Sequence, residues 1–353
     1  MSKNRRLAAV LGLAASTALL AACGHASQPS AAKRPTIGFV YAASKVSFAS
    51  EMARGFQAGA ERVGGVEVKT EAPEFIDGPR QVELLQQMAG SAKGGISVNA
   101  VVGDIIAEPM AQVARAGIPL MAVDGMPSAG SGAQLLVAND NFELGRLLGA
   151  EIVRRLPAGA TGTIVAGSPQ PGIPVLEARV EGVRDVLKAK LPGVRVLGPF
   201  ATGREEKEAT AVWTTVVKAN PKALMFFGVG DSDGVALAQI RQATHATWLA
   251  AGFDVADTAL PAVASGDLIA LVSPEHYLEG AVAGQLQASY AKSGRALPKG
   301  WVETPGLLVT SGNVQDVIKR QASDASRAAW FGPKADEIVA HLDTYLHPLD
   351  QAR

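Results

Sequence analysis

Charged and aromatic side chains recur at the ends of short β-rich runs in this chain of 353 residues. An ionised carboxylate accepts hydrogen bonds and an arginine only donates them, so together they can hold a small polar ligand. Each aspartate alone could instead be a turn or helix-cap residue. Their recurrence at equivalent places in both halves of the chain indicates a ligand site, made of residues 44–48, Asp104, Asp124, Arg179, Asp231 and Asp254.

The runs that must position these residues alternate with amphipathic helical stretches from Thr36 onward. A first series reads T-I-G-F-V-Y, V-E-V-K-T, G-I-S-V-N and I-P-L-M-A-V-D, and a second begins at G-T-I-V-A-G and ends at L-I-A-L-V-S. Strands that alternate with helices predict βαβ units and parallel sheets. Ligands of such sheets bind outside the carboxyl ends of the strands, where the polar residues stand. The predicted fold class is α/β, in two similar halves.

Catalytic and metal-binding patterns are missing from the sequence. The five histidines are scattered, and no G-x-S-x-G, H-E-x-x-H or P-loop pattern occurs. D-S-D-G at Asp231 lacks the later ligands of a calcium-binding EF-hand loop. We therefore expect no catalytic residue, no metal and no cofactor.

Composition sets further limits. The 33 Lys and Arg residues balance the 33 Asp and Glu residues. A chain without net charge gives no sign of a nucleic-acid-binding or polybasic membrane surface. More than one hydrophobic core is expected at this length, so two domains are predicted.

The only cysteine, Cys23, follows a basic start and an apolar run over residues 7–20. This is the plan of a secretory signal, and the run is shorter than the roughly 20 residues that cross a bilayer. L-A-A-C resembles the lipobox of bacterial lipoproteins, whose cysteine is acylated. We expect a signal peptide at 1–22, a flexible tether at 23–35, and a membrane anchor through Cys23 on the extracytoplasmic side. The alternative is a plain cleaved signal, with Cys23 as a packing residue.

Several motifs in order make the chain similar to the type I periplasmic binding proteins, the ribose- and galactose-binding group. They are T-I-G-F-V-Y before E-M-A-R-G-F, I-P-L-M-A-V-D, N-D-N-F-E-L-G, A-R-V-E-G, G-V-G-D-S-D-G and A-G-F-D. The resemblance implies two doubly wound parallel-sheet lobes joined by a three-segment hinge. The lobes would be residues 36–138 plus 274–305 and residues 139–273 plus 306–320. Residues 321–353 would form a helical extension that packs on a lobe.

The same resemblance implies a sugar or polyol ligand between the lobes. Phe48 would stack on the ligand, Asp124 and Asp254 would accept its hydrogen bonds, and Arg179 would donate. Departures from the family pattern, at Val46, Ala49, Gly125 and Gly230, predict a roomier pocket on the first-lobe side. Asp231 stands beside Gly230, and residues that could compensate for the departures are Lys45, Asp104, Arg204, Asp233, Glu275 and His276.

These expectations combine into a monomeric, lipid-anchored solute-binding protein that delivers a sugar or polyol to an ABC transporter permease. A receptor that presents its ligand to a membrane sensor, or that reads a quorum signal, is the alternative. A remote alternative is a glycoside-processing enzyme, since two carboxylates facing a sugar suit glycoside hydrolysis.

Overall fold

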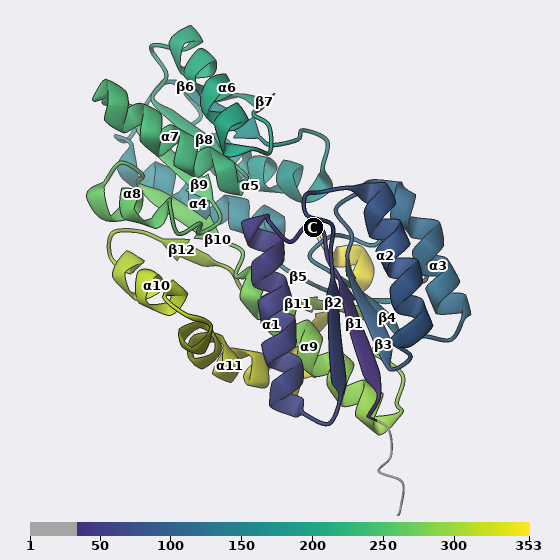
Figure 1. The fold of residues 1–353 in the computed structure, drawn as a ribbon. Helices are drawn as coiled ribbons and strands as arrows, with labels where there is room; N and C mark the ends of the chain where they lie inside the picture. The colour runs from purple at the N-terminus through teal and green to yellow at the C-terminus, as the bar shows by residue number, and fades with distance from the viewer. Residues whose placement is uncertain (1–33) are drawn as a thin grey trace, which may run out of the picture. The chain divides into compact units, whose positions relative to one another are not determined.

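Two β-sheets, each covered by helices, make up the part of the chain that the structure describes (Figure 1). The structure is a computed structural model that describes residues 34–353. The predicted signal peptide and Cys23 lie outside the described residues. No helix of residues 34–353 has the length and apolar composition to cross a membrane.

The first lobe is built on a seven-stranded sheet of order β13-β11-β5-β4-β3-β1-β2, parallel except for the β11–β13 pair. Its elements are β1 (Thr36–Val40), α1 (Ser47–Val63), β2 (Glu67–Glu71), α2 (Gly78–Ser91), β3 (Gly95–Asn99), the 3-10 helix η1 (Gly103–Ile106), α3 (Ala107–Arg115), β4 (Leu120–Val123), β5 (Leu135–Ala138), α9 (His276–Ser293), β11 (Gly300–Glu303), α11 (Asp324–Ala340), α12 (Leu342–Tyr345), β13 (Leu346–His347) and the 3-10 helix η2 (Leu349–Gln351).

The second lobe is built on a six-stranded sheet of order β12-β10-β9-β8-β6-β7, parallel except for the β10–β12 pair. Its elements are α4 (Asn141–Arg155), β6 (Gly162–Ser168), α5 (Pro174–Lys190), β7 (Val194–Ala201), α6 (Glu206–Ala219), β8 (Met225–Gly228), α7 (Asp231–Thr244), β9 (Leu249–Phe253), α8 (Leu260–Ser265), β10 (Ala270–Ser273), β12 (Leu307–Val309) and α10 (Val314–Gln321). The predicted α/β fold class, with two parallel-sheet lobes, is confirmed.

Three chain crossings join the lobes: from β5 to α4, from β10 to α9, and from β11 to β12. The buried Asn139, on the first crossing, holds the other two. Its Nδ2 donates to the carbonyl of Pro274 at 2.8 Å and to that of Thr304 at 2.9 Å. One side chain therefore ties all three crossings together.

The C-terminal region adds a fourth passage between the lobes. Val314 and Val317 of α10 pack in a core of the second lobe, whereas Phe331, Ala335 and Ile338 of α11 pack in a core of the first. The extension contains more than the predicted helix, because β13 pairs with β11 at the sheet edge. The last residue then returns to α4, where its carbonyl accepts a hydrogen bond from the Asn141 amide at 2.7 Å.

Glycines allow one pair of helices in each lobe to pack at very short range. In the first lobe, a Cβ atom at Gly55 of α1 would overlap the carbonyl oxygen of Tyr277, and one at Gly280 of α9 would overlap that of Met52. In the second lobe, Gly145 of α4 and Gly182 of α5 contact the partner backbone in the same way. These helices carry residues that face the space between the lobes, so their spacing fixes where those residues stand.

We predict that Gly280→Ala lowers the free energy of unfolding by about 2 kcal/mol, because the added methyl group forces the two backbones apart. Gly90→Ala is the matched control, since Gly90 lies in α2 and a Cβ there meets no atom within 4 Å. Alanine at that position should raise the stability by about 0.5–1 kcal/mol. Urea unfolding of both variants measures this, and a Gly280→Ala variant as stable as the unmodified protein would refute the packing argument.

Candidate functional site

A cavity of about 190 Å³ lies between the two lobes and is lined by both. Val46, Phe48, Phe75, Ile76, Val101 and Asp124 line it from the first lobe, together with His276 at the start of α9. Arg179, Arg204, Asp231 and Asp254 are among the residues that line it from the second lobe. The structure thus brings seven of the nine predicted ligand-site residues to one space: Phe48, Asp124, Arg179, Arg204, Asp231, Asp254 and His276.

Asp124 and Asp254 occupy equivalent positions in the two lobes. Each follows a central strand directly, Asp124 after β4 and Asp254 after β9, and each has a left-handed backbone, with φ of 65° and 64°. The amide of each donates to the adjacent strand at 2.8 Å, to the carbonyls of Val137 and Val272. Aspartate tolerates this conformation better than most residues, and such strain gathers at functional sites. The turn places both side chains against the cavity, where they are buried.

The guanidinium of Arg179 is held in a fixed position. Its Nε donates to Asn141 Oδ1 at 2.9 Å and its Nη1 to the Val229 carbonyl at 2.8 Å, with Nη1 3.7 Å from Asp254 Oδ2. The group also lies over the Phe253 ring, 4.9 Å from its centre. Within residues 34–353, Nη2 makes no hydrogen bond, which leaves it able to donate to a ligand in the cavity.

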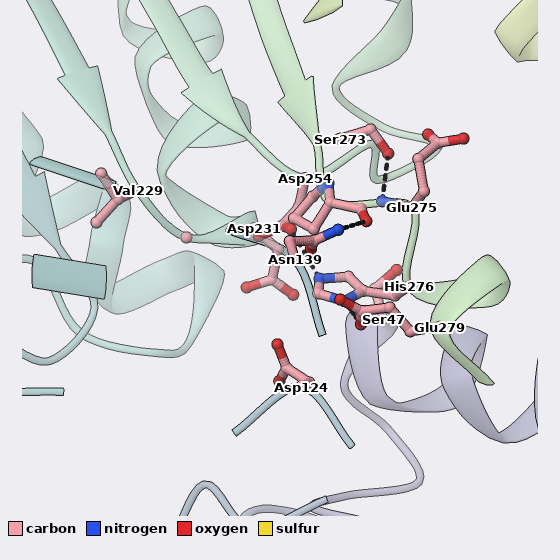
Figure 2. Close-up of polar contacts among 12 residues, drawn as sticks. Ser47, Asp124, Asn139, Val229, Asp231, Asp254, Ser273, Glu275, His276 and Glu279 are labelled. Atoms are coloured by element: carbon pink, nitrogen blue, oxygen red, sulfur yellow. Dashed lines mark hydrogen bonds and ion pairs between the residues drawn. The ribbon is translucent and has the colours of Figure 1, made fainter. Parts of the chain in front are cut away.

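His276 links two buried carboxylates. Its Nε2 lies 3.1 Å from Asp254 Oδ1 and its Nδ1 lies 3.0 Å from Glu279 Oε2. Burial alone would lower the pKa of His276, but the hydrogen bonds to Asp254 and Glu279 raise it well above its usual value. Both ring nitrogens therefore lie within hydrogen-bond distance of a carboxylate, and these two contacts favour the charged form of the imidazole. Figure 2 shows its ring beside Asp254 and Glu279, with Asp124 and Asp231 directed toward the same space.

Asp124, His276 and Glu279 also stand close enough to hold a metal ion, with their ligand atoms all within 4.8 Å of one another. Metal ligation requires an unprotonated imidazole nitrogen. The two nitrogens of His276 lie within hydrogen-bond distance of Asp254 and Glu279, whereas Asp124 accepts a hydrogen bond from Asn99.

Asp231 is the most strongly perturbed carboxyl group that lines the cavity. Burial and the neighbouring carboxylates of Asp254 and Asp233 raise its pKa to about 7. Asp233 itself does not line the cavity. It accepts hydrogen bonds from the Trp213 indole at 2.8 Å and from the Gly230 amide at 3.0 Å, and so caps α7 beneath the site.

Two predicted site residues, Asp104 and Glu275, lie outside the cavity. Asp104 is exposed on η1. Glu275 is buried, has a left-handed backbone with φ of 63°, and pairs with Arg320 at 2.6 Å instead.

The two basic residues that could compensate for the family departures differ in position. Lys45 is exposed and pairs with Glu74, whereas Arg204 lines the cavity and donates to Gln170.

Sequence reasoning missed the residues that hold the charged groups in place. Asn99 ends β3, next to β4, and donates to Asp124 Oδ2 at 3.1 Å. Asn141 holds Arg179, and Glu279 holds His276. The position of Asn99 at the carboxyl end of a strand was a usable signal, since it shares that edge with Asp124.

We predict that Asp231 makes the stability of the protein depend on pH. Its pKa is higher in the folded protein than in the unfolded chain, so the folded state binds more protons and stability falls as the pH rises from about 4 to about 7. Asp231→Asn removes this loss and should be more stable than the unmodified protein at pH 8 by on the order of 2 kcal/mol. At pH 4 the variant and the unmodified protein should be about equally stable. Thermal melting curves of both proteins from pH 4 to pH 8 test this prediction, and equal melting temperatures at pH 8 would contradict it.

Comparison with solved structures places the fold among the type I periplasmic binding proteins. A carbohydrate transporter solute-binding protein from Agrobacterium radiobacter, in complex with D-arabinose, has a TM-score of 0.73 at 21% identity, over 83% of this chain and 100% of that one. A periplasmic ribose ABC transporter protein from Conexibacter woesei has a TM-score of 0.71 at 21% identity, over 84% of this chain and 98% of that one. GanP, a glucose-galactose binding protein from Geobacillus stearothermophilus, has a TM-score of 0.71 at 18% identity, over 80% of this chain and 99% of that one.

No curated protein sequence matches the chain. The family model described as "periplasmic binding protein domain" matches residues 37–296, which is most of both lobes. The motif resemblance seen in the sequence is thereby confirmed. The chain belongs to the periplasmic binding protein domain family.

Proposed function

We propose that the protein captures a sugar or polyol between its lobes outside the cytoplasmic membrane and hands it to an ABC transporter permease without changing it. The observation that carries this proposal is the meeting of charged groups from both lobes in one cavity, Asp124 from the first and Arg179 and Asp254 from the second. The sugars bound by the structurally similar proteins support the ligand class.

The charged groups suit an uncharged, hydroxylated ligand. Hydroxyls can donate to Asp124 and Asp231 and accept from Nη2 of Arg179, while the Phe48 ring offers an apolar face to C–H groups. Phe48 lies 5.5 Å from the His276 ring, centre to centre, so the aromatic wall adjoins the charged one. Hydrogen bonds to charged groups contribute roughly 1.5–3 kcal/mol each. A few of them would offset the cost of ordering the ligand.

Closure of the lobes follows from where these contacts lie. A ligand shifts a conformational equilibrium only by binding one state better than the other. A sugar that reaches Asp124 and Arg179 at once gains contacts from both lobes only when they are close together. The three crossings around Asn139 and the passage from α10 to α11 are all short, so few residues need to change conformation for the lobes to move.

We predict that a thermal-shift screen of pentoses, hexoses, inositols and linear polyols finds a ligand that raises the melting temperature, since a ligand selective for the folded state stabilises it. Asp124→Asn should weaken binding of that ligand at least tenfold, because asparagine has one acceptor oxygen in place of two and carries no negative charge. Asp104→Asn is the matched control, as Asp104 is exposed and outside the cavity. Unchanged affinity in Asp124→Asn, or no response to any sugar or polyol, would refute the proposed site.

A lipid anchor at Cys23 is part of the proposal, supported by the L-A-A-C motif and by the secretory plan of residues 1–22. We predict that Cys23→Ser moves the protein from the membrane fraction to the soluble fraction when cells are fractionated. An intact protein that remains in the membrane fraction after this change would contradict the anchor.

Presentation of the ligand to a membrane sensor is the alternative role. Uptake of the labelled ligand by cells with and without the protein separates import from signalling.

A further inference from the structure

The cavity between the lobes has two chemically different ends. Its charged groups are deeply buried: Asp124 is 5% exposed, Arg179 3% and Asp254 8%. Phe75, which lines the same cavity, is 49% exposed. These three charged groups therefore lie at the inner end of the cavity, and an apolar surface that includes Phe75 lies toward solvent.

Both lobes contribute to this apolar surface, which we call the apolar mouth. The first lobe supplies Phe75 and Ile76, between β2 and α2, and Val101, just after β3. The second lobe supplies Ile173 and Leu176, at the start of α5. Leu176 packs in part against a core of the second lobe, whereas the other four side chains belong to no lobe core although each is apolar. Apolar surface of this kind, continuous with a polar site, is typical of a place where a ligand binds.

A free sugar does not match the apolar mouth. Its hydroxyls lie around the whole ring, and those directed outward would lose water against Phe75, Ile76 and Val101 without gaining a partner there, at a cost in affinity. Gln170, Arg204 and Glu205 offer polar groups on the second lobe only. Among residues 34–353, no charged side chain lines the first-lobe side of the mouth, and the nearest cation, Lys45, lies over the Phe75 ring at 5.9 Å from its centre and pairs with Glu74.

We propose that the natural ligand is a sugar or polyol that carries an apolar substituent, such as an alkyl or aryl glycoside. Its hydroxylated ring binds Asp124, Arg179 and Asp254 at the inner end, and its substituent fills the apolar mouth between Phe75 and Ile173. This inference rests on the proposed sugar-binding function and specifies the ligand class for the same cavity.

The test compares each free sugar with its own methyl and phenyl glycosides, in both anomeric forms, for ribose, arabinose, glucose and galactose. We expect at least one phenyl glycoside to bind at least tenfold tighter than its parent sugar by calorimetry, which corresponds to about 1.4 kcal/mol. The methyl glycoside should lie between the two. Phe75→Ser should remove most of this gain and leave the affinity for the parent sugar within about threefold.

Ile105→Ser is the matched control, because Ile105 is also 49% exposed and on the first lobe but does not line the cavity. It should keep the full gain. Parent sugars that bind tighter than all their glycosides would overturn the inference and leave the proposed sugar-binding function intact. A gain in affinity that survives Phe75→Ser would do the same. Binding of neither sugars nor glycosides would overturn both.

Discussion

The hydrogen bonds of the Asn139 side chain are the interaction on which the rest of the site depends. Its amide nitrogen holds the carbonyls of Pro274 and Thr304, so the three crossings between the lobes meet at one buried group. Residues that follow two of these crossings hold binding groups of the cavity. Asn141 comes two residues after Asn139 and holds Arg179, and His276 comes two residues after Pro274 and holds Asp254. The joint between the lobes and the binding groups are thus parts of one network.

Close helix packing makes each lobe a rigid support for its share of that network. Gly182 of α5 lies against the backbone of α4, and Gly280 of α9 lies against that of α1. Arg179 is on α5, His276 is on α9, and Phe48 is on α1. Tightly packed interiors resist deformation, so we expect any movement between the lobes to occur at the passages that join them, including the one from α10 to α11. The lobes can then move as units while the geometry of each half-site is kept.

The sequence was sufficient for the fold class, and for some of the residues that follow strands and line the cavity. Asp124 and Asp254 were found because parallel strands bring their carboxyl ends to one edge. Asp104 and Glu275 satisfy the same rule, but η1 leaves the first in solvent and Arg320 pairs with the second. Such outcomes depend on partners distant in the chain, which spacing does not reveal. The apolar mouth was missed for a similar reason, since Phe75 and Ile173 come from separate loops and look like ordinary apolar residues.

We propose that both lobes hold one ligand molecule at once. A crystal structure of the complex with the tightest ligand found by screening tests it most directly. We expect hydroxyls of a single ligand within about 3.2 Å of Asp124 and of Arg179 or Asp254. A ligand that contacts only one lobe, or that binds outside this cavity, would contradict the account.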